Sequence, residues 1–326
     1  MKIIYCIILI LTLNILAYGK ENSIFFPFLN SIYKLNLSND KFEKIKETSH
    51  LFSKNYFYFF DYIILFDQNQ KEILAYSLTK KDITPLLKGN ISNIYVNNDK
   101  LIAISININE KSEFEIIQYS LSQKKNKISI TKDKTYYSDI FASDYGIIDN
   151  LFFISGVDST NSYSKIMAID LTKKEINEFY KTKNSNDFIK IIPSETNFIF
   201  YLSQSKYKED SNNSIWFSTT QPNKLSNKNL SIKNLSFYGK GFTKDNNYYI
   251  PAIDKSNSTY IIKFELKNIE KPSIIPIDTG IYHLIYKSQD KSYFIGYNYY
   301  KSNNKFYFVI FNNTTYKSQS ILINGE

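Results

Sequence analysis

The chain has 326 residues, of which 43% are hydrophobic, and it contains only 9 glycines and 7 prolines. This composition is sufficient for a packed core and excludes a linker or an intrinsically disordered chain. All 40 basic residues are lysines and the net charge at pH 7 is +9. The planar guanidinium on which specific phosphate and base readout usually depends is therefore missing, and we expect no nucleic-acid partner.

Residues 1–19 have the order of parts that is typical of a secretory signal peptide. Lys2 precedes an apolar run over residues 3–16, and Ala17-Tyr18-Gly19 has small residues at its first and third positions. Because the run is shorter than the roughly 20 residues that span a bilayer, we predict cleavage after Gly19, export to the periplasm or the cell surface, and no transmembrane segment in the mature chain. An uncleaved membrane anchor is the alternative. Cys6 is the single cysteine, so the mature chain is expected to have no disulfide and no cysteine-based metal site.

Residues 91–131 are the clearest example of one complete four-stranded β-sheet. Short runs of β-branched and aromatic residues are separated there by Asn, Asp, Lys and Ser, which favour turns. The runs are 91–96 (ISNIYV), 100–106 (KLIAISI), 113–121 (EFEIIQYSL) and 126–131 (NKISIT). We interpret this unit as one blade of a β-propeller.

The third run of this unit recurs along the chain at intervals of 40 to 50 residues, which is the spacing of propeller repeats. Its recurrences begin at Ser31, Lys71, Glu113, Tyr163, Asn213, Tyr260 and Asn304. We therefore predict an all-β fold, a single β-propeller domain over residues 20–326 with about seven four-stranded blades, and a monomer. Six or eight blades also fit the spacing. The first unit supplies only three runs, at 23–28, 31–37 and 42–46, so either the first blade is short or the chain ends complete it.

The run before each third run is more uniformly apolar, as in 62–66 (YIILF) and 198–202 (FIFYL). A continuous apolar run implies burial on both faces of a strand, whereas the third runs tend to alternate. This gradient is expected when sheets stack face to face around an axis, an arrangement that also protects the sheet edges. The strands are too short for an outer-membrane barrel, and no linker indicates tandem sandwiches.

The segment 165–176 (KIMAIDLTKKEI) resembles the outer hairpin of blades in the broad group of WD40-like, quinoprotein-like and YVTN-type propellers, and 32–45 and 73–87 resemble it too. The chain has no Trp-Asp dipeptide, no Gly-Gly pair of kelch repeats and no repeated Trp of quinoprotein blades. The resemblance therefore implies an architecture and no catalytic residue.

The sequence contains no recognisable catalytic or metal-binding motif, and we predict no metal and no cofactor. His50 and His283 are far apart and belong to no HxxxH or HExxH pattern, and there is no GxSxG, phosphate-binding Gly-rich loop or calcium loop. Asp158 and Asp254 occupy equivalent places just after the second run of a unit, as does Asp67. Each either caps a turn by accepting backbone hydrogen bonds or, for Asp158 and Asp254, supplies one of the paired carboxylates that a glycosidase needs.

The longest loop at this place in a unit covers residues 204–212 (QSKYKEDSN) and contains Lys206, Tyr207 and Lys208. Because loops on rigid scaffolds carry binding functions, these three residues, with Asp158 and Asp254, are the candidate binding residues; a solvated hairpin end is the alternative. The sequence favours an exported, non-catalytic propeller that binds another envelope or extracellular protein. A carbohydrate-binding or carbohydrate-cleaving propeller is the alternative.

Overall fold

A computed structural model describes fifteen stretches of the chain: residues 23–53, 55–108, 113–124, 127–148, 150–158, 163–182, 187–193, 198–205, 214–219, 225–229, 235–237, 241–245, 247–265, 268–297 and 305–323. The regular elements in these stretches are all β-strands, so the all-β prediction is confirmed. No helix within them is long and apolar enough to cross a membrane. The predicted signal peptide, residues 1–19, lies outside the described residues.

The chain divides into two compact units, one of Met1–Ile104 and Ser120–Thr131, the other of Ser105–Tyr119 and Lys132–Glu326. The first unit holds a three-stranded sheet of β1 (Ser23–Phe28), β2 (Ser31–Asn36) and β3 (Lys41–Glu47). Its second sheet consists of β4 (Phe57–Phe59), β5 (Tyr62–Asp67), β6 (Glu72–Ser77) and β7 (Ile83–Lys88). A third sheet contributes to both units and contains β8 (Ile91–Asn97), β9 (Lys100–Ile108), β10 (Phe114–Lys124) and β11 (Lys127–Ser138).

The second unit contains four further sheets. Two of them are β12 (Ile140–Ile148), β13 (Leu151–Asp158), β14 (Ser164–Asp170) and β15 (Glu175–Lys181), and β16 (Asp187–Pro193), β17 (Phe198–Ser205), β18 (Ser214–Thr219) and β19 (Leu225–Asn229). The next contains β20 (Leu235–Phe237), β21 (Phe242–Lys244), β22 (Asn247–Asp254), β23 (Ser258–Glu265) and β24 (Asn268–Thr279). The last contains β25 (Ile281–Lys287), β26 (Lys291–Tyr297), β27 (Phe306–Asn312) and β28 (Ser318–Leu322).

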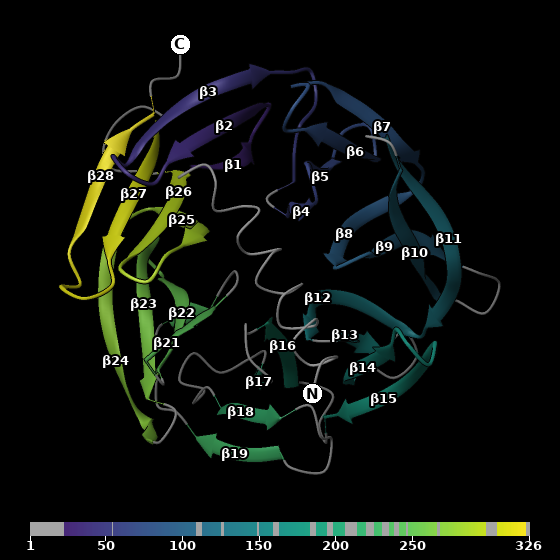
Figure 1. Cartoon of the computed structure of the whole chain (residues 1–326). Helices are drawn as coiled ribbons and strands as arrows, with labels where there is room; N and C mark the ends of the chain where they lie inside the picture. The colour runs from purple at the N-terminus through teal and green to yellow at the C-terminus, as the bar shows by residue number, and fades with distance from the viewer. Residues whose placement is uncertain are drawn as a thin grey trace, which may run out of the picture. The chain divides into compact units, whose positions relative to one another are not determined.

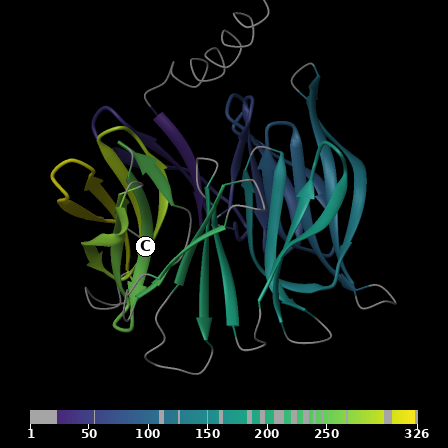
Figure 2. The same cartoon turned by 90° about the horizontal axis from the view of Figure 1, so that it is seen from below.

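Each sheet takes its strands from one continuous stretch of chain, and neighbouring strands such as β5 and β6 or β13 and β14 pair antiparallel (Figure 1). The yellow and yellow-green strands β25–β28, for example, lie side by side in both views (Figures 1 and 2). Because β20 and β21 pair with successive parts of β22, they occupy one strand position. The described residues thus form six sheets that each have four strand positions, and a first sheet that has three. This number agrees with the predicted number of about seven blades.

The predicted third runs are also confirmed. Each begins within two residues of a strand that pairs with the apolar strand before it: β2, β6, β10, β14, β18, β23 and β27. Three strands were predicted for the first blade, and its sheet consists of β1, β2 and β3.

Short capped turns set the register of the outer hairpins. Between β14 and β15, Asp170 Oδ1 accepts hydrogen bonds from the backbone N–H groups of Thr172 and Lys173, both at 2.9 Å. The N–H of Lys174 donates to the Asp170 carbonyl at 2.7 Å, and Lys174 adopts a φ of 61°. Asn312 caps the turn between β27 and β28 in the same way. Asn and Asp favour this role because their short side chains bond the backbone two residues on.

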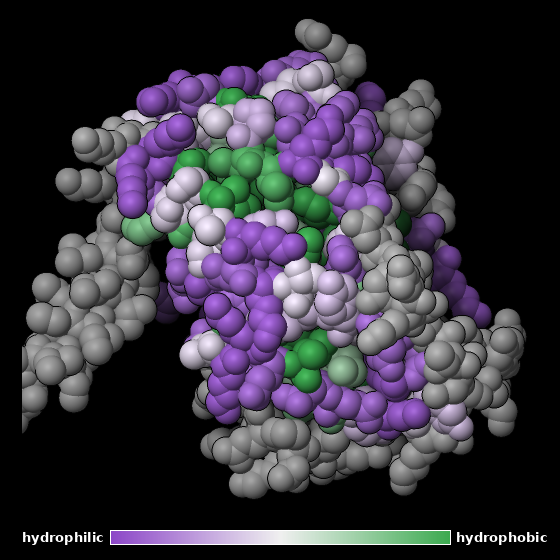
Figure 3. Space-filling view, turned by 90° about the vertical axis from the view of Figure 1, so that its right-hand side faces the viewer, coloured by the Kyte–Doolittle hydropathy of each residue, from purple (hydrophilic) through white to green (hydrophobic). Residues whose placement is uncertain are grey.

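The core lies between neighbouring sheets of the same unit. All six residues of β5, the second strand of its sheet, are buried, whereas the fourth strands β7 and β15 expose every residue at least in part. The predicted burial gradient is therefore confirmed. One apolar cluster joins the first two sheets through Phe25, Phe52 and Ile63, among others. In Figure 3, hydrophilic residues cover most of the described surface on the side shown, with hydrophobic residues visible between them.

The edge of β1 that no described strand covers is blunted by side chains. The Tyr58 hydroxyl accepts a hydrogen bond from the Phe25 N–H at 2.8 Å and donates one to the Phe25 carbonyl. Two residues on, Pro27 has no N–H to offer. Proline and covering side chains are common means of preventing an edge strand from pairing with another chain. Tyr58 thus satisfies backbone groups that a further strand would have paired.

Tyr76 and Tyr58 contact the same apolar cluster, but only Tyr58 uses its hydroxyl. The Tyr76 side chain is fully buried, and its hydroxyl has no hydrogen-bond partner among the described residues. A buried hydroxyl without a partner carries an uncompensated desolvation cost.

We therefore expect Tyr76→Phe to raise the free energy of unfolding by about 1 kcal/mol, and Tyr58→Phe to lower it by about 1 to 2 kcal/mol, measured by urea unfolding. Equal destabilisation by both substitutions would contradict the assignment.

Candidate functional site

Three aspartates occupy equivalent places, as the sequence predicts. Asp67, Asp158 and Asp254 are the last residues of β5, β13 and β22, each of which is the second strand of its sheet. The turn that follows each one leads to the third strand. What differs between them is the partner that each carboxylate binds.

Asp254 caps its turn. Its Oδ1 accepts hydrogen bonds from the N–H groups of Ser256 and Ser258, both at 2.9 Å, and from the Ser256 hydroxyl at 2.7 Å. The Tyr260 hydroxyl donates to Oδ2 at 3.0 Å. Burial by itself raises the pKa of Asp254, but the hydrogen bonds lower the pKa by more than burial raises it. The pKa of Asp254 therefore lies below its usual value. The carboxylate is ionised and engaged in holding the turn.

Asp158 forms a buried ion pair with Lys165, which also contacts two exposed acids. The Lys165 Nζ lies 2.5 Å from Asp158 Oδ2 and 2.6 Å from Asp139 Oδ2, with Glu178 Oε2 at 3.8 Å. The side chains of Asp158 and Lys165 are 1% and 9% exposed. Burial by itself lowers the pKa of Lys165, but the hydrogen bonds and attraction from Asp139 and Asp158 raise it above its usual value. The ammonium group stays charged and fixes β14 to the residues around it.

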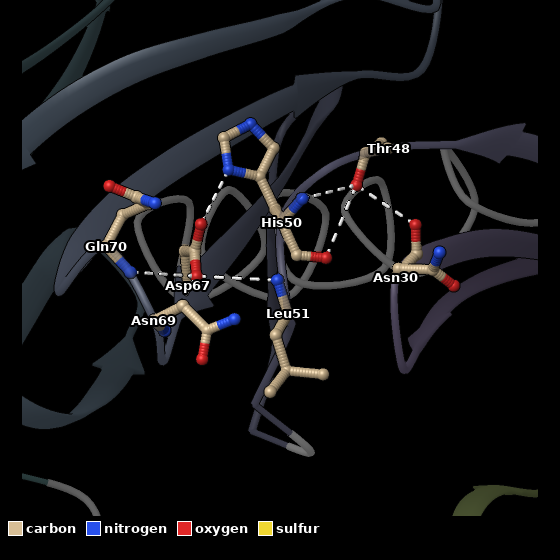
Figure 4. Close-up of polar contacts among 7 residues, drawn as sticks. All are labelled: Asn30, Thr48, His50, Leu51, Asp67, Asn69 and Gln70. Atoms are coloured by element: carbon tan, nitrogen blue, oxygen red, sulfur yellow. Dashed lines mark hydrogen bonds and ion pairs between the residues drawn. The ribbon is translucent and has the colours of Figure 1, made fainter.

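Asp67 is bound to a histidine (Figure 4). Its Oδ1 accepts hydrogen bonds from the N–H groups of Asn69 at 2.8 Å and Gln70 at 3.1 Å, with Leu51 N–H at 3.4 Å. Its Oδ2 lies 2.6 Å from His50 Nδ1. Burial by itself raises the pKa of the fully buried Asp67, but the His50 and backbone hydrogen bonds hold it below its usual value. Asp67 is therefore an ionised carboxylate enclosed by donors.

This geometry fixes the state of the His50 ring. An ionised carboxylate only accepts, so Nδ1 carries a hydrogen, and a neutral ring then has its acceptor lone pair at Nε2. The His50 side chain is 25% exposed, and no hydrogen bond to Nε2 occurs within the described residues. The backbone is held as well, because the His50 N–H donates to the Thr48 hydroxyl at 3.1 Å and that hydroxyl donates to the Asn30 carbonyl at 3.0 Å (Figure 4). His50 can thus offer one oriented nitrogen to a ligand.

The sequence did not reveal this pair. His50 and Asp67 are 17 positions apart, and His50 precedes β4 in the linker between two sheets, so no motif spacing connects them. The isolated bridge between Phe52 and Asp67 brings the linker alongside β5. His283 lies in β25, the first strand of its sheet.

The other candidate residues are not brought together within the described part of the chain. Lys206, Tyr207 and Lys208 lie outside the described residues. Asp158 binds Lys165, and Asp254 binds its own turn and Tyr260, so these contacts do not join the two carboxylates. Within the described part of the chain, no group of three or more His, Cys, Asp or Glu side chains could hold a metal ion.

Comparisons with known proteins identify the fold. No protein-family model matches the chain, and no curated protein does. The β-propeller domain of the Trilobed protease from Pyrococcus furiosus is similar, with a TM-score of 0.57 and 12% identity over 90% of each chain. The acylaminoacyl peptidase of Pyrococcus horikoshii matches 89% of this chain at a TM-score of 0.55 and 11% identity, and one of two prolyl endopeptidases matches 93% at 0.56 and 8%.

This chain spans about half the length of those two peptidase chains, 47% and 49% respectively. At these identities the likeness shows the fold alone. The protein is a β-propeller, as the sequence predicts.

The low pKa of Asp67 makes its contribution to stability depend on pH. Because its folded-state pKa lies below that of the unfolded chain, the stabilisation is present above about pH 4 and is lost as the pH falls through the folded-state pKa. We expect Asp67→Asn to lower the free energy of unfolding at pH 7 by about 2 kcal/mol. The gap between wild type and variant should shrink below about pH 4 in urea unfolding. The exposed Asp61→Asn should have little effect; a gap that persists to pH 2 would contradict the role of Asp67.

Removing one partner of the buried Lys165 cluster should cost more than removing both. Lys165→Met leaves the Asp158 carboxylate buried without its cation and should lower the free energy of unfolding by about 3 kcal/mol. The double variant Asp158→Asn/Lys165→Met should recover most of this loss, because no buried charge then lacks its counter-ion. Lys173→Met, on the exposed turn, is the control. Additive losses in the double variant would show that the two side chains act independently.

Proposed function

We propose that this protein is an exported, non-catalytic β-propeller that binds another protein through the end of its sheets where the second and third strands are joined. One observation carries the proposal. The acids that could have acted in catalysis at this end are each committed to an internal partner: Asp254 to its turn and Asp158 to Lys165. They stabilise the turns that display the loops and leave recognition to the groups between and beside them.

The same contacts weigh against a glycosidase. Such an enzyme needs one carboxyl group with a raised pKa as the acid and a second carboxylate as the base or nucleophile. The pKa of Asp254 is lowered, and Asp158 lies against an ammonium group. A rigid scaffold with exposed loops supports binding better than bond cleavage.

Export is part of the proposal and rests on the signal-peptide pattern of residues 1–19. A binding role needs no cysteine and no cofactor, in keeping with a mature chain that would contain no cysteine. Within the first unit, His50 is a further candidate ligand group beside the β5–β6 turn of its own sheet, since its ring is oriented by Asp67 and partly exposed.

Amine-reactive crosslinking in intact producing cells tests the proposal, because the 40 lysines offer many attachment points. We expect one protein to be captured in near-stoichiometric amount, together with a chain that begins at Lys20. The captured protein is then purified, and its affinity for the chain is measured by titration calorimetry. The triple variant Lys206→Ala/Tyr207→Ala/Lys208→Ala and, separately, His50→Ala should weaken this affinity.

Lys173→Ala/Lys317→Ala is the matched control, because these lysines flank turns between third and fourth strands. It should leave the affinity unchanged. Recovery of the chain without a protein, followed by binding on a glycan array, would replace the proposal by the carbohydrate-binding alternative. A captured chain that retains residues 1–19 would contradict export.

A further inference from the structure

The segment that carries His50 is hydrogen-bonded to both of the first two sheets. On one side, the Thr48 N–H donates to the Asn30 carbonyl at 2.9 Å, in the turn between β1 and β2. On the other side, the Ser53 N–H donates to the Phe66 carbonyl of β5 at 2.8 Å. Because the backbone is fixed on both sides of His50, the position of its ring is set by the fold before any ligand binds.

The imidazole ring of His50 has two close neighbours within the protein. Its Nδ1 lies 2.6 Å from Asp67 Oδ2, and the buried ring of Phe52 lies 6.0 Å away between centroids. In Figure 4 the second ring nitrogen, Nε2, points away from the other residues drawn. No hydrogen bond or ion pair reaches Nε2 within the described part of the chain. Nε2 is therefore the ring atom that a ligand can engage.

The charged groups on the surrounding elements leave the ring with one charged neighbour, Asp67. Glu47, at the end of β3, is paired with Lys44 at 2.9 Å. The turn between β1 and β2 carries no charged residue. In the turn between β5 and β6, Lys71 forms no ion pair with His50 or Asp67, as far as the described residues extend. A proton taken up by the ring would add a positive charge that Asp67 alone offsets.

The state of the ring decides which chemical group can bind to it. Because the ionised Asp67 keeps the hydrogen on Nδ1, the neutral ring offers Nε2 as an acceptor, and a ligand has to supply an O–H or N–H group. An imidazole changes its charge between about pH 5 and pH 8. In the protonated ring both nitrogens are donors, so the same ligand group would then face a donor and lose its hydrogen bond.

We propose that His50 makes binding of the partner protein sensitive to acid: its neutral Nε2 accepts a hydrogen bond from an O–H or N–H group of the partner, and protonation of the ring releases that partner. This inference rests on the proposed function, since it names the chemistry and the regulation of the same binding end. The expected sign follows from the geometry, because an acceptor is lost as the pH falls.

The first test measures the ring in the full chain without a partner. The chain contains two histidines, so long-range ¹H–¹⁵N NMR spectra contain two sets of ring signals, and those missing from His50→Gln belong to His50. We expect a neutral ring with its hydrogen on Nδ1 at about pH 7.5 and a ring protonated on both nitrogens at about pH 5.5. A hydrogen on Nε2 at the higher pH, or one unchanged state at both, overturns the inference.

The second test measures the affinity for the purified partner by titration calorimetry. We expect the wild type to bind about tenfold more weakly at about pH 5.5 than at about pH 7.5. In His50→Gln the side-chain amide does not titrate. This variant should bind several-fold more weakly than the wild type at the higher pH, because Asp67 no longer orients an imidazole, and it should lose the tenfold drop at the lower pH.

His283→Gln is the matched control. It removes the other histidine, which lies in β25 of the second unit, and should keep the tenfold drop. Titrating groups of the partner affect all three proteins equally, so the difference between the two variants isolates His50. Urea unfolding at both values of pH checks that each protein is folded under the conditions of the titration.

The outcomes separate this inference from the proposed function. An affinity that does not change with pH, or one that changes equally in His50→Gln, removes the inference and leaves the proposed function intact. Stronger binding of the wild type at the lower pH, absent from His50→Gln, would show that the partner offers an acceptor such as a carboxylate, and would also overturn the inference. A wild-type chain that captures no protein removes both.

Discussion

The constraint on which the rest of the structure depends is that the second strand of each sheet is apolar on both faces. β5 buries all six of its residues, and β13, β22 and β26 are buried over most of their length. A single sheet cannot cover both faces of its own strand, so each sheet must lie against neighbours. The apolar clusters accordingly combine residues of adjacent sheets, such as Phe153 and Ile166 with Ile191. This packing needs no disulfide, because burial of apolar surface supplies the driving force.

The turns then decide what each equivalent position does. Asp67, Asp158 and Asp254 end the same strand of three different sheets, yet one binds an imidazole, one an ammonium group and one a pair of serines with a tyrosine. A carboxylate at this place has to be satisfied because it is at least partly enclosed. The carboxylates of Asp158 and Asp254 are bound to internal partners. Asp67 also orients His50, whose Nε2 makes no hydrogen bond within the described residues. The chemistry available at this position therefore depends on which side chain the adjacent segment of the same chain places beside the aspartate.

A stable framework also allows local costs. The three-stranded first sheet is protected at its edge by Tyr58 and Pro27, and the turns at Phe60 and Tyr316 keep an aromatic residue at a positive φ. The first of these departures has a structural reason, since it satisfies backbone groups at an edge.

The sequence by itself determined the strands, their order and the length of the repeat, because alternation, apolar runs and turn residues are local signals. It also located Asp158 and Asp254 at the ends of second strands, and it offered turn capping as one of their roles. Tertiary structure alone decided which distant groups meet: Lys165 with Asp158 and Asp139, His50 with Asp67, and the Tyr58 hydroxyl with Phe25. These contacts join different strands or different sheets, so their residues share no spacing in the chain. The exposure and strain of Phe60 were equally hidden, since a left-handed backbone conformation is a property of the closed turn and leaves no mark on a Phe-Asp pair in the sequence.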